Sequence, residues 1–281
     1  MRSLLYSIVI ILSLIVSVRH VSAAPVPPLV VRAPALAVYG WKDGVMTELA
    51  SKRQHYLHPI ASIVKLVTAK VAQELYTKDA IFTISPKAVS VSGSIKGIVP
   101  GAQFTRDDLL TALLVQSSND SAMALMEPVG STTFLAHMND FIHRNRYTMT
   151  SFINPSGLDP AKGSKLAPNR MTPYHLSRLL SDIYEHDPLM TRIMGQSKAY
   201  ITDQKTGAQL EIRTSNGLYF FDDYKDKVLI GKTGLTNSAK ESIAFITPGT
   251  ASYDYITVVI LGSTDRVRDA MAVLDWIKRT Q

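Results

Sequence analysis

The spacing of apolar and polar residues changes twice along the chain. Residues 34–39 and 45–50 are short apolar segments on either side of Asp43-Gly44, a dipeptide typical of tight hairpin turns. They predict a β-hairpin near the start of the sequence. From residue 199 onward, short runs of apolar residues between turn residues again predict strands, at 199–202, 210–213, 228–230, 243–247 and 255–261. An amphipathic helix is predicted at 267–279.

Between the two strand regions, apolar residues recur at helical spacing. Ile63, Leu66, Val67 and Leu75 fall on one face of a helix predicted over residues 62–76. A glycine-rich loop at 90–101 follows, and Thr105 is a suitable N-cap for the next helix. Further helices are predicted over 120–126, 132–144 and 172–184, the last with Thr172 as N-cap and Pro173 at its first position.

The order of these elements favours one architecture. Strands at both ends of the chain and helices between them are most simply joined in one antiparallel sheet with a helical insertion. The predicted fold class is therefore α/β, of the α+β kind: an antiparallel sheet flanked by helices, with an inserted all-helical subdomain at roughly residues 77–195. We expect a ligand site in the cleft between the sheet and this insertion.

Composition narrows the function classes. The chain has 281 residues, 30 Lys and Arg against 23 Asp and Glu, a net charge of +7 and no cysteine. Thiol nucleophiles, cysteine zinc sites, Fe–S clusters and disulfides are therefore excluded. The mild positive charge suits an ordinary solvated surface or attraction to a polyanion such as an anionic cell envelope. Nucleic acid is not an expected partner, because no basic stripe with interleaved aromatic residues is present.

The N-terminus has the order of a secretory signal peptide. Arg2 precedes an apolar run at residues 4–18, and the small residues of Val21-Ser22-Ala23-Ala24 follow. We expect a signal peptide at 1–23, cleaved after Ala23, and a catalytic domain at 24–281. An uncleaved anchor is the alternative, although the apolar run is shorter than the roughly 20 residues of a membrane span. The mature protein is then expected to be exported, periplasmic or extracellular, without a stable membrane anchor.

Two short motifs contain serine hydroxyl groups. In the first the serine lies close to a lysine, and in the second the serines lie at a predicted helix end. Ser62-Ile63-Val64-Lys65 begins a predicted helix, where a spacing of three places both side chains on one face. A serine hydroxyl becomes a useful nucleophile when a neighbouring base takes its proton. Ser117-Ser118-Asn119 lies where the helix after Thr105 ends. It fits either a helix terminus with a new N-cap or a hydroxyl relay at Ser117 beside an amide at Asn119.

The third motif, Lys-Thr-Gly, occurs twice. Lys205-Thr206-Gly207 stands between two short strands and is interpreted as a hairpin turn without chemistry. Lys232-Thr233-Gly234 follows the apolar run 228–231 and lies on a predicted buried strand. Lysine is seldom buried without a partner. A second ammonium close to Lys65 would disfavour the charged form of one lysine, which could then serve as a neutral base.

In this order, the three motifs resemble the serine acyl-enzyme signature of penicillin-binding proteins and class A β-lactamases. The chain resembles the low-molecular-mass penicillin-binding proteins, which are serine D-alanyl-D-alanine carboxypeptidases and endopeptidases. The resemblance covers nearly all of the mature chain. It extends to Pro59-Ile60-Ala61, Asp108-Leu109-Leu110, Gln116, Asn154-Pro155-Ser156-Gly157-Leu158 and Gly231.

The resemblance implies roles for the catalytic residues. Ser62 would attack the carbonyl between two D-residues of a peptidoglycan stem peptide, with Lys65 as general base. Ser117 and Lys232 would pass the proton to the leaving amine, and water would release the acyl-enzyme. β-Lactams would acylate the same serine. No cofactor and no metal are expected.

The resemblance also implies the substrate-binding residues. The backbone N–H groups of Ser62 and Leu235 would form the oxyanion hole. Thr233, followed by Gly234, would hold the terminal carboxylate of the substrate, and Asn119 would bind its backbone amide. The expected partners are the peptidoglycan peptide and β-lactam inhibitors, and the protein is expected to be a monomer.

The chain departs from the family pattern at several positions. Val64 replaces a common threonine, His175 stands where aspartate is frequent, and Lys240 stands where glycine is frequent. Ser215 falls near the place where some relatives carry an arginine for the substrate carboxylate, and Arg213 is a candidate substitute. Because 49 residues follow Lys232, no additional C-terminal domain is expected, which favours the small, endopeptidase-like members.

Three alternatives share parts of this pattern. A class A-like β-lactamase needs a glutamate between the second and third motifs. That interval has Glu127, Glu185 and Glu211, none of them in the loop at 154–159. A non-hydrolytic β-lactam or peptidoglycan sensor is disfavoured by the intact lysines. A zinc peptidase is disfavoured because His55-x-x-His58 is present and His-Glu-x-x-His is not.

Overall fold

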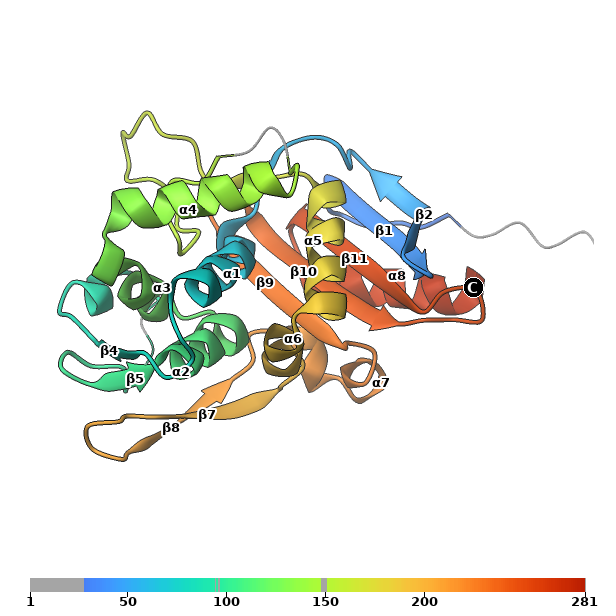
Figure 1. Ribbon diagram of the computed structural model, residues 1–281. Helices are drawn as coiled ribbons and strands as arrows, with labels where there is room; N and C mark the ends of the chain where they lie inside the picture. Colours follow the sequence, from blue (N-terminus) through green and yellow to red (C-terminus); the bar gives the residue numbers. More distant parts are fainter. Residues whose placement is uncertain (1–27, 94, 96, 148–150, 281) are drawn as a thin grey trace, which may run out of the picture.

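Five strands form a central antiparallel sheet in the order β2-β1-β11-β10-β9. The computed structural model describes residues 28–93, 95, 97–147 and 151–280, so the predicted signal peptide lies outside the described residues. The strands are β1 (Ala35–Lys42), β2 (Val45–Lys52), β9 (Ile230–Thr236), β10 (Lys240–Pro248) and β11 (Tyr255–Ser263). The N-terminal hairpin joins the C-terminal strands where β1 pairs with β11. This confirms the predicted single sheet built from both strand regions (Figure 1).

The hairpin between β1 and β2 follows from its turn residues. Asp43 and Gly44 have φ values of 49° and 73°, and Lys42 pairs with Val45 across the turn. Positive φ at both central residues is the requirement of a type I′ turn, whose twist matches that of the strands. Strand β1 is buried at every position except Lys42, as expected for a strand covered on both faces.

Helices cover both faces of the sheet. Helix α5 (Pro173–His186) packs against β1 and β11 on one face, and α8 (Arg266–Thr280) packs against β10 and β11 on the other (Figure 1). The side chains of β1 alternate accordingly, with Ala35 and Ala37 in one apolar cluster and Leu36 and Val38 in the second.

The region between β2 and β9 is mainly helical. Its helices are α1 (Lys65–Leu75), α2 (Arg106–Thr111), α3 (Asn119–Met126), α4 (Ser131–Arg144), α5, α6 (Pro188–Met194) and α7 (Asp222–Lys225). Helices α1 to α4 lie beside the β9 edge of the sheet, whereas α5 lies on one face of it (Figure 1). The region also contains short strands, β3 (His58–Pro59), β4 (Ile81–Thr83), β5 (Gln103–Thr105) and β6 (Arg170–Met171), in the pairs β3-β6 and β4-β5. Helix α6 and these strand pairs were not predicted from the sequence.

Two predicted helix starts are confirmed in detail. The Thr105 side chain accepts a hydrogen bond from the backbone N–H of Asp108, whose carboxylate accepts from the N–H of Thr105, which completes a capping box. Thr172 caps α5, and Pro173 occupies its first turn, where a missing N–H is tolerated. The predicted helix over 62–76 is divided into a 3₁₀ turn, η1 (Ala61–Val64), and α1.

Two predicted strands do not belong to the central sheet, contrary to the expectation from the sequence. Strands β7 (Lys198–Thr202) and β8 (Gln209–Arg213) form a separate two-stranded hairpin rather than part of the central sheet (Figure 1). Their side chains alternate between buried and less buried positions, because only one face packs on the helical region. A central strand such as β11 is instead buried at nearly every position.

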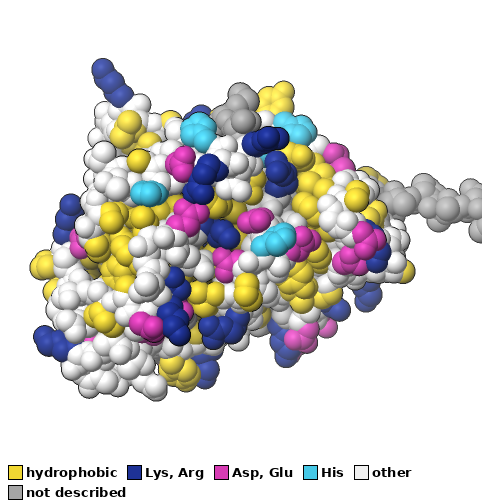
Figure 2. All heavy atoms as spheres, in the orientation of Figure 1, with side chains coloured by type: hydrophobic (Ala, Val, Ile, Leu, Met, Phe, Trp, Pro, Cys, Tyr) yellow, Lys and Arg dark blue, Asp and Glu magenta, His cyan; other side chains and the backbone are white. Residues whose placement is uncertain are grey.

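Charges of both signs are interspersed over the face shown in Figure 2. This face carries no continuous basic stripe. Among the helices of the described residues, none is long and apolar enough to cross a bilayer.

Candidate active site

Ser62 and Lys65 meet at the junction of η1 and α1. Lys65 Nζ lies 2.7 Å from Ser62 Oγ, because side chains three apart nearly eclipse one another on a 3₁₀ turn. The Ser62 side chain is half-buried, whereas Lys65 has an exposed fraction of 0%. The structure therefore places a fully buried amine directly beside a hydroxyl that solvent can reach.

The Lys65 amine has three polar neighbours. It donates to Asn119 Oδ1 at 2.7 Å and to the carbonyl oxygen of Ser156 at 2.6 Å, and Ser62 Oγ is the third. Both oxygens on Asn119 and Ser156 only accept hydrogen bonds, so a neutral amine can satisfy them with its two N–H bonds. Its lone pair is then left for the Ser62 hydroxyl. Burial and the nearby Lys232 lower the pKa of Lys65 well below its usual range.

A second hydroxyl and lysine pair faces the first. Lys232 on β9 donates to Ser117 Oγ at 2.7 Å and to the carbonyl oxygen of the next residue, Thr233, at 3.0 Å. Lys232 is 1% exposed. Burial, followed by the charge of Arg266, lowers the pKa of Lys232 to about 7. Such a group can both give and take a proton near neutral pH.

Ser117 occupies a sharp reversal of the chain. It follows the π-helical turn η3 (Ala112–Gln116) and has a left-handed backbone with φ 68°. The next residue, Ser118, caps α3 by accepting a hydrogen bond from the N–H of Ser121. The segment thus serves as both the helix terminus and the hydroxyl position that the sequence left open. Strained backbone at such a turn is a common feature of functional sites.

Asn119 joins the lysine pair to a neighbouring loop. Its Nδ2 donates to the carbonyl oxygen of Ser92 at 2.6 Å, while its Oδ1 accepts from Lys65. The side chain is 7% exposed. Its position is therefore set from both sides.

The Thr233-Gly234-Leu235 segment of β9 runs beside Ser62. A Cβ atom added to Gly234 would lie 2.7 Å from the carbonyl oxygen of Ile60 and 3.3 Å from the backbone nitrogen of Ser62. A side chain at residue 234 would hence push β9 away from η1. Leu235, by contrast, is 62% exposed at the mouth of the site.

The two candidates near the expected carboxylate position, Ser215 and Arg213, lie differently toward Thr233. Ser215 Oγ is hydrogen-bonded to Thr233 Oγ1 at 2.6 Å. Arg213, the candidate substitute for a missing arginine, is instead 70% exposed and pairs with Glu211 at 2.6 Å. On β8 successive side chains point to opposite faces, and the Arg213 side chain lies on the solvent face. The structure therefore brings Ser215, and not Arg213, to Thr233.

Three groups of the site were not assigned a role from the sequence. The Ser156 carbonyl oxygen accepts from Lys65, and Gly157 lies so close to η1 that a Cβ would approach the Ala61 carbonyl oxygen to 2.1 Å. Arg266 Nη1 donates to the Gly234 carbonyl oxygen at 3.0 Å. Residues 154–158 share in the family resemblance, but the sequence carries no signal for the role of a backbone carbonyl group.

The other sequence candidates lie elsewhere. Lys205-Thr206-Gly207 forms the turn between β7 and β8, where Asp203 accepts from Thr206 Oγ1 at 2.7 Å. His58 pairs with Met171 through β3 and β6. No group of three or more His, Asp or Glu side chains able to hold a metal ion occurs in the described part of the chain.

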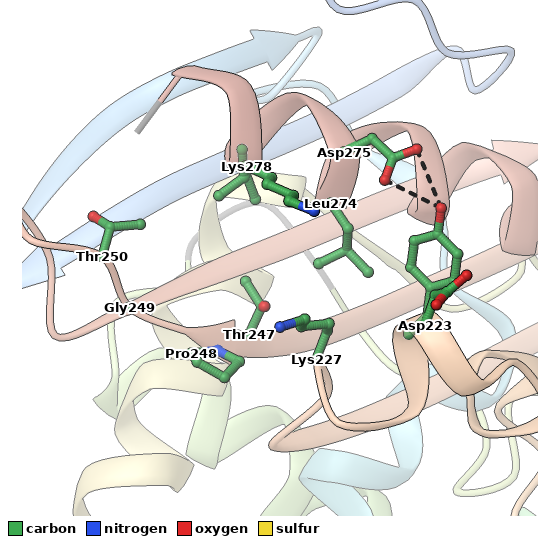
Figure 3. A pocket seen from close by; sticks show the side chains of 11 residues that line it. Asp223, Lys227, Thr247, Pro248, Gly249, Thr250, Leu274, Asp275 and Lys278 are labelled. Carbon is green, nitrogen blue, oxygen red and sulfur yellow. Dashed lines mark hydrogen bonds between the residues drawn. The ribbon is translucent and has the colours of Figure 1, made fainter.

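Two sizeable cavities differ in their relation to this site. One, of about 730 Å³, is lined by Ser92, whose carbonyl oxygen accepts from Asn119, and by Leu235, which follows Gly234 on β9. Another, of about 530 Å³, lies between α7, the end of β10 and α8, with Lys227 and Lys278 at its sides (Figure 3). None of the four hydroxyl and amine groups described above lines either cavity, and only the first is connected to the site, through Ser92 and Leu235.

Comparison with known proteins gives a consistent result. The family model described as D-alanyl-D-alanine carboxypeptidase matches residues 44–264. A D-alanyl-D-alanine endopeptidase of Pseudomonas aeruginosa is 28% identical over 294 residues, which cover 100% of this chain and 90% of that protein.

Solved structures show the same fold. The D-alanyl-D-alanine carboxypeptidase from Mycobacterium tuberculosis H37Rv has a TM-score of 0.77 and 22% identity, covering 93% of this chain and 96% of that one. Penicillin-Binding Protein D2 from Listeria monocytogenes, in its ampicillin-bound form, has a TM-score of 0.73 and 23% identity, covering 89% and 98%.

Proposed function

Because the chain belongs to the D-alanyl-D-alanine carboxypeptidase family, we propose that it hydrolyses D-alanyl-D-alanine bonds, or the corresponding crosslinks, in peptidoglycan stem peptides. The reaction proceeds through an acyl-enzyme on Ser62 and is inhibited by β-lactams. The observation that carries this proposal is the buried Lys65 amine 2.7 Å from the Ser62 hydroxyl.

Acylation begins when Ser62 Oγ attacks the carbonyl carbon of the scissile bond. The hydroxyl proton moves to the neutral Lys65 amine, whose charged form is disfavoured by burial and by Lys232. The carbonyl oxygen becomes an oxyanion, which accepts hydrogen bonds from the backbone N–H groups of Ser62 and Leu235. Donors fixed in this way typically contribute a few kcal/mol of transition-state stabilisation.

The leaving amine needs a proton as the bond breaks. Ser117 and Lys232, 2.7 Å apart, pass to it the proton that Lys65 took from Ser62, so that Lys65 is neutral again, and the pKa of about 7 allows Lys232 to take and give a proton in this relay. The terminal carboxylate of the substrate binds at Thr233, supported by Ser215. Water then attacks the ester carbonyl, neutral Lys65 accepts the water proton, and this proton passes to Ser62 Oγ as the bond between Oγ and the acyl carbon breaks.

The β-lactamase alternative lacks its deacylating carboxylate in this arrangement. Each of the three candidate glutamates bonds elsewhere, Glu127 to Ser85, Glu185 to Tyr255 and Glu211 to Arg213. Slow release of a penicilloyl group is therefore the expected behaviour. The remaining proposals are a signal peptide at 1–23, a single catalytic domain at 24–281, and action of the monomer in the cell envelope.

The test uses the mature protein and its Ser62→Ala variant. The wild type should be labelled by a fluorescent penicillin and should release D-alanine from a peptide ending in D-Ala-D-Ala, or monomers from a crosslinked muropeptide. Ser62→Ala should lose at least about 10³-fold in labelling rate, because it removes the nucleophile. Ser252→Ala, in an exposed loop, is the matched control and should label normally. Labelling retained by Ser62→Ala would refute the nucleophile, and rapid penicillin turnover would favour a β-lactamase.

A further inference from the structure

The cavity that adjoins the site is formed by four separate segments. Its walls come from Ser92, from Leu158 and Asp159, from the hairpin joining β9 to β10, and from Ser263 and Thr264 at the end of β11. Leu235 links it to the oxyanion position, and the Ser92 carbonyl oxygen links it to Asn119. The volume of about 730 Å³ can hold a peptide side chain, with two leucines as apolar lining.

The charged side chains that line this cavity differ in whether they already form hydrogen bonds or ion pairs. Asp159 accepts from Thr236 Oγ1 and from the N–H of Ser238, both at 2.9 Å, and Glu241 accepts from the N–H of Arg266 at 3.0 Å. Lys240 also lines the cavity and is exposed, yet it takes part in none of the ion pairs found among the described residues. The cavity thus presents one uncommitted cation beside two carboxylates that are already hydrogen-bonded.

The backbone at Lys240 is strained. Its φ is 52°, a left-handed conformation that costs a residue with a Cβ about 1–2 kcal/mol. Lys240 ends the short turn at 237–239 and pairs with Thr236, so a glycine would meet the same geometry without strain. A side chain kept in such a conformation at the edge of a site is grounds for a functional hypothesis.

The direction of the substrate follows from the proposed function. With the terminal carboxylate at Thr233 and the scissile carbonyl at Leu235, the peptide runs along β9 toward Thr236. The part of the substrate that precedes the scissile bond therefore extends into the cavity at the end of this strand. Lys240, which pairs with Thr236, lines the cavity at that end, as does Asp159.

We propose that Lys240 binds a carboxylate on the acyl side of the substrate, so that the enzyme prefers stem peptides whose residue before D-Ala-D-Ala has an aliphatic side chain ending in a free carboxylate. This proposal rests on the proposed function. The aliphatic part of that side chain packs on Leu158 and Leu235, and the carboxylate reaches the Lys240 ammonium. An ion pair at an exposed position gives a modest preference, weakened by salt.

The test compares three peptides that differ at one group. In each peptide, D-Ala-D-Ala follows an acetylated residue with a four-methylene side chain. This side chain ends in a carboxylate in the first peptide, in the corresponding carboxamide in the second and in an amine in the third. D-Alanine release gives kcat/KM for each. We expect the carboxylate peptide to exceed the carboxamide by about fivefold, the upper range of an exposed ion pair, and this ratio to fall as salt is raised. A preference for the amine peptide would overturn the proposal.

Variants of the protein test whether Lys240 causes the preference for the carboxylate peptide. Lys240→Met should reduce the carboxylate-to-carboxamide ratio to about one, and Lys240→Arg should restore it. Because the ratio is measured on the same preparation, it does not depend on the fraction of folded protein. Lys227→Met, which removes a lysine lining the distant cavity, is the control and should keep the wild-type ratio. An unchanged ratio in Lys240→Met would overturn the proposal.

The two proposals fail in different ways. If the wild type is not labelled by penicillin and cleaves none of the peptides or muropeptides, the proposed function is wrong. If it is labelled and cleaves the three peptides at equal rates, the proposed function stands and the role of Lys240 is refuted.

Discussion

Replacing Asn119 by aspartate tests the central feature of the site, the neutral amine of Lys65. The substitution Asn119→Asp keeps an oxygen 2.7 Å from Lys65 Nζ but adds a negative charge. A carboxylate at this position favours the ammonium form, so the pKa of Lys65 rises. The base is then available only at higher pH.

The size of the effect can be worked from the geometry. Two unit charges about 4 Å apart interact by about 4 kcal/mol at an effective dielectric constant near 20. At roughly 1.4 kcal/mol for each pKa unit, this raises the pKa of Lys65 by about three units. At pH values below the pKa of Lys65 in both proteins, the labelling rate of Asn119→Asp should therefore be about 10³-fold lower than that of the wild type.

The assay is the second-order rate constant for labelling by a fluorescent penicillin, measured from about pH 5 to about pH 10. The rising limb of the Asn119→Asp profile should move to higher pH. Asn119→Ala is the control for the loss of the amide, since it loses the hydrogen bonds to Lys65 and to the Ser92 carbonyl oxygen without adding charge. The plateau of the Asn119→Ala pH profile should be lower than that of the wild type. Its rising limb should stay at the same pH or move to lower pH. If Asn119→Asp is folded and its limb does not move, neutral Lys65 is not the base.

Two further substitutions probe packing and charge around β9. Gly234→Ala places a Cβ 2.7 Å from the Ile60 carbonyl oxygen, so it should cost about 1–3 kcal/mol in urea unfolding and reduce the labelling rate at least tenfold. Gly231→Ala, on the same strand but against Asn216 and Phe245, should retain the labelling rate; equal losses in both would refute a local effect on Ser62. The pKa of Lys232, about 7 against the usual 10.5, means that the unfolded chain binds more protons between these values. The free energy of unfolding should hence rise by up to about 1 kcal/mol per unit from pH 7 to pH 9. Lys232→Met should reduce this slope without abolishing it, because the lowered pKa of Lys65 acts in the same direction, and an unchanged slope would contradict the lowered pKa of Lys232.

The sequence predicted the elements that depend on local patterns. The Asp43-Gly44 turn and the caps at Thr105 and Thr172 each act within a few residues, and the structure has all three. The proximity of Ser62 to Lys65 follows from one turn of helix. The juxtaposition of Lys65 with Lys232 was inferred from the need to explain a buried lysine, which is an electrostatic argument independent of distance along the chain.

What could not be predicted depends on groups without a pattern of their own. The β7-β8 hairpin has the same alternation as a half-buried sheet strand, so its sequence does not indicate which sheet it joins. Arg266 reaches Gly234 only because β9, β10 and β11 adopt one register before α8 begins. The Ser156 carbonyl oxygen is a backbone group, and its approach to Lys65 depends on the fold of a long loop.

The pairing of β1 with β11 makes the site a late product of folding. Ala35 faces Leu261, so the central strand is completed by residues near the other end of the chain. Contacts at such a separation form slowly, because closing a long loop costs entropy before the contact is gained. During synthesis, Ser62 and Lys65 emerge long before Lys232. A nascent chain is therefore expected to be inert to penicillin until β9 to β11 have been added, so that labelling would report completed assembly of the sheet.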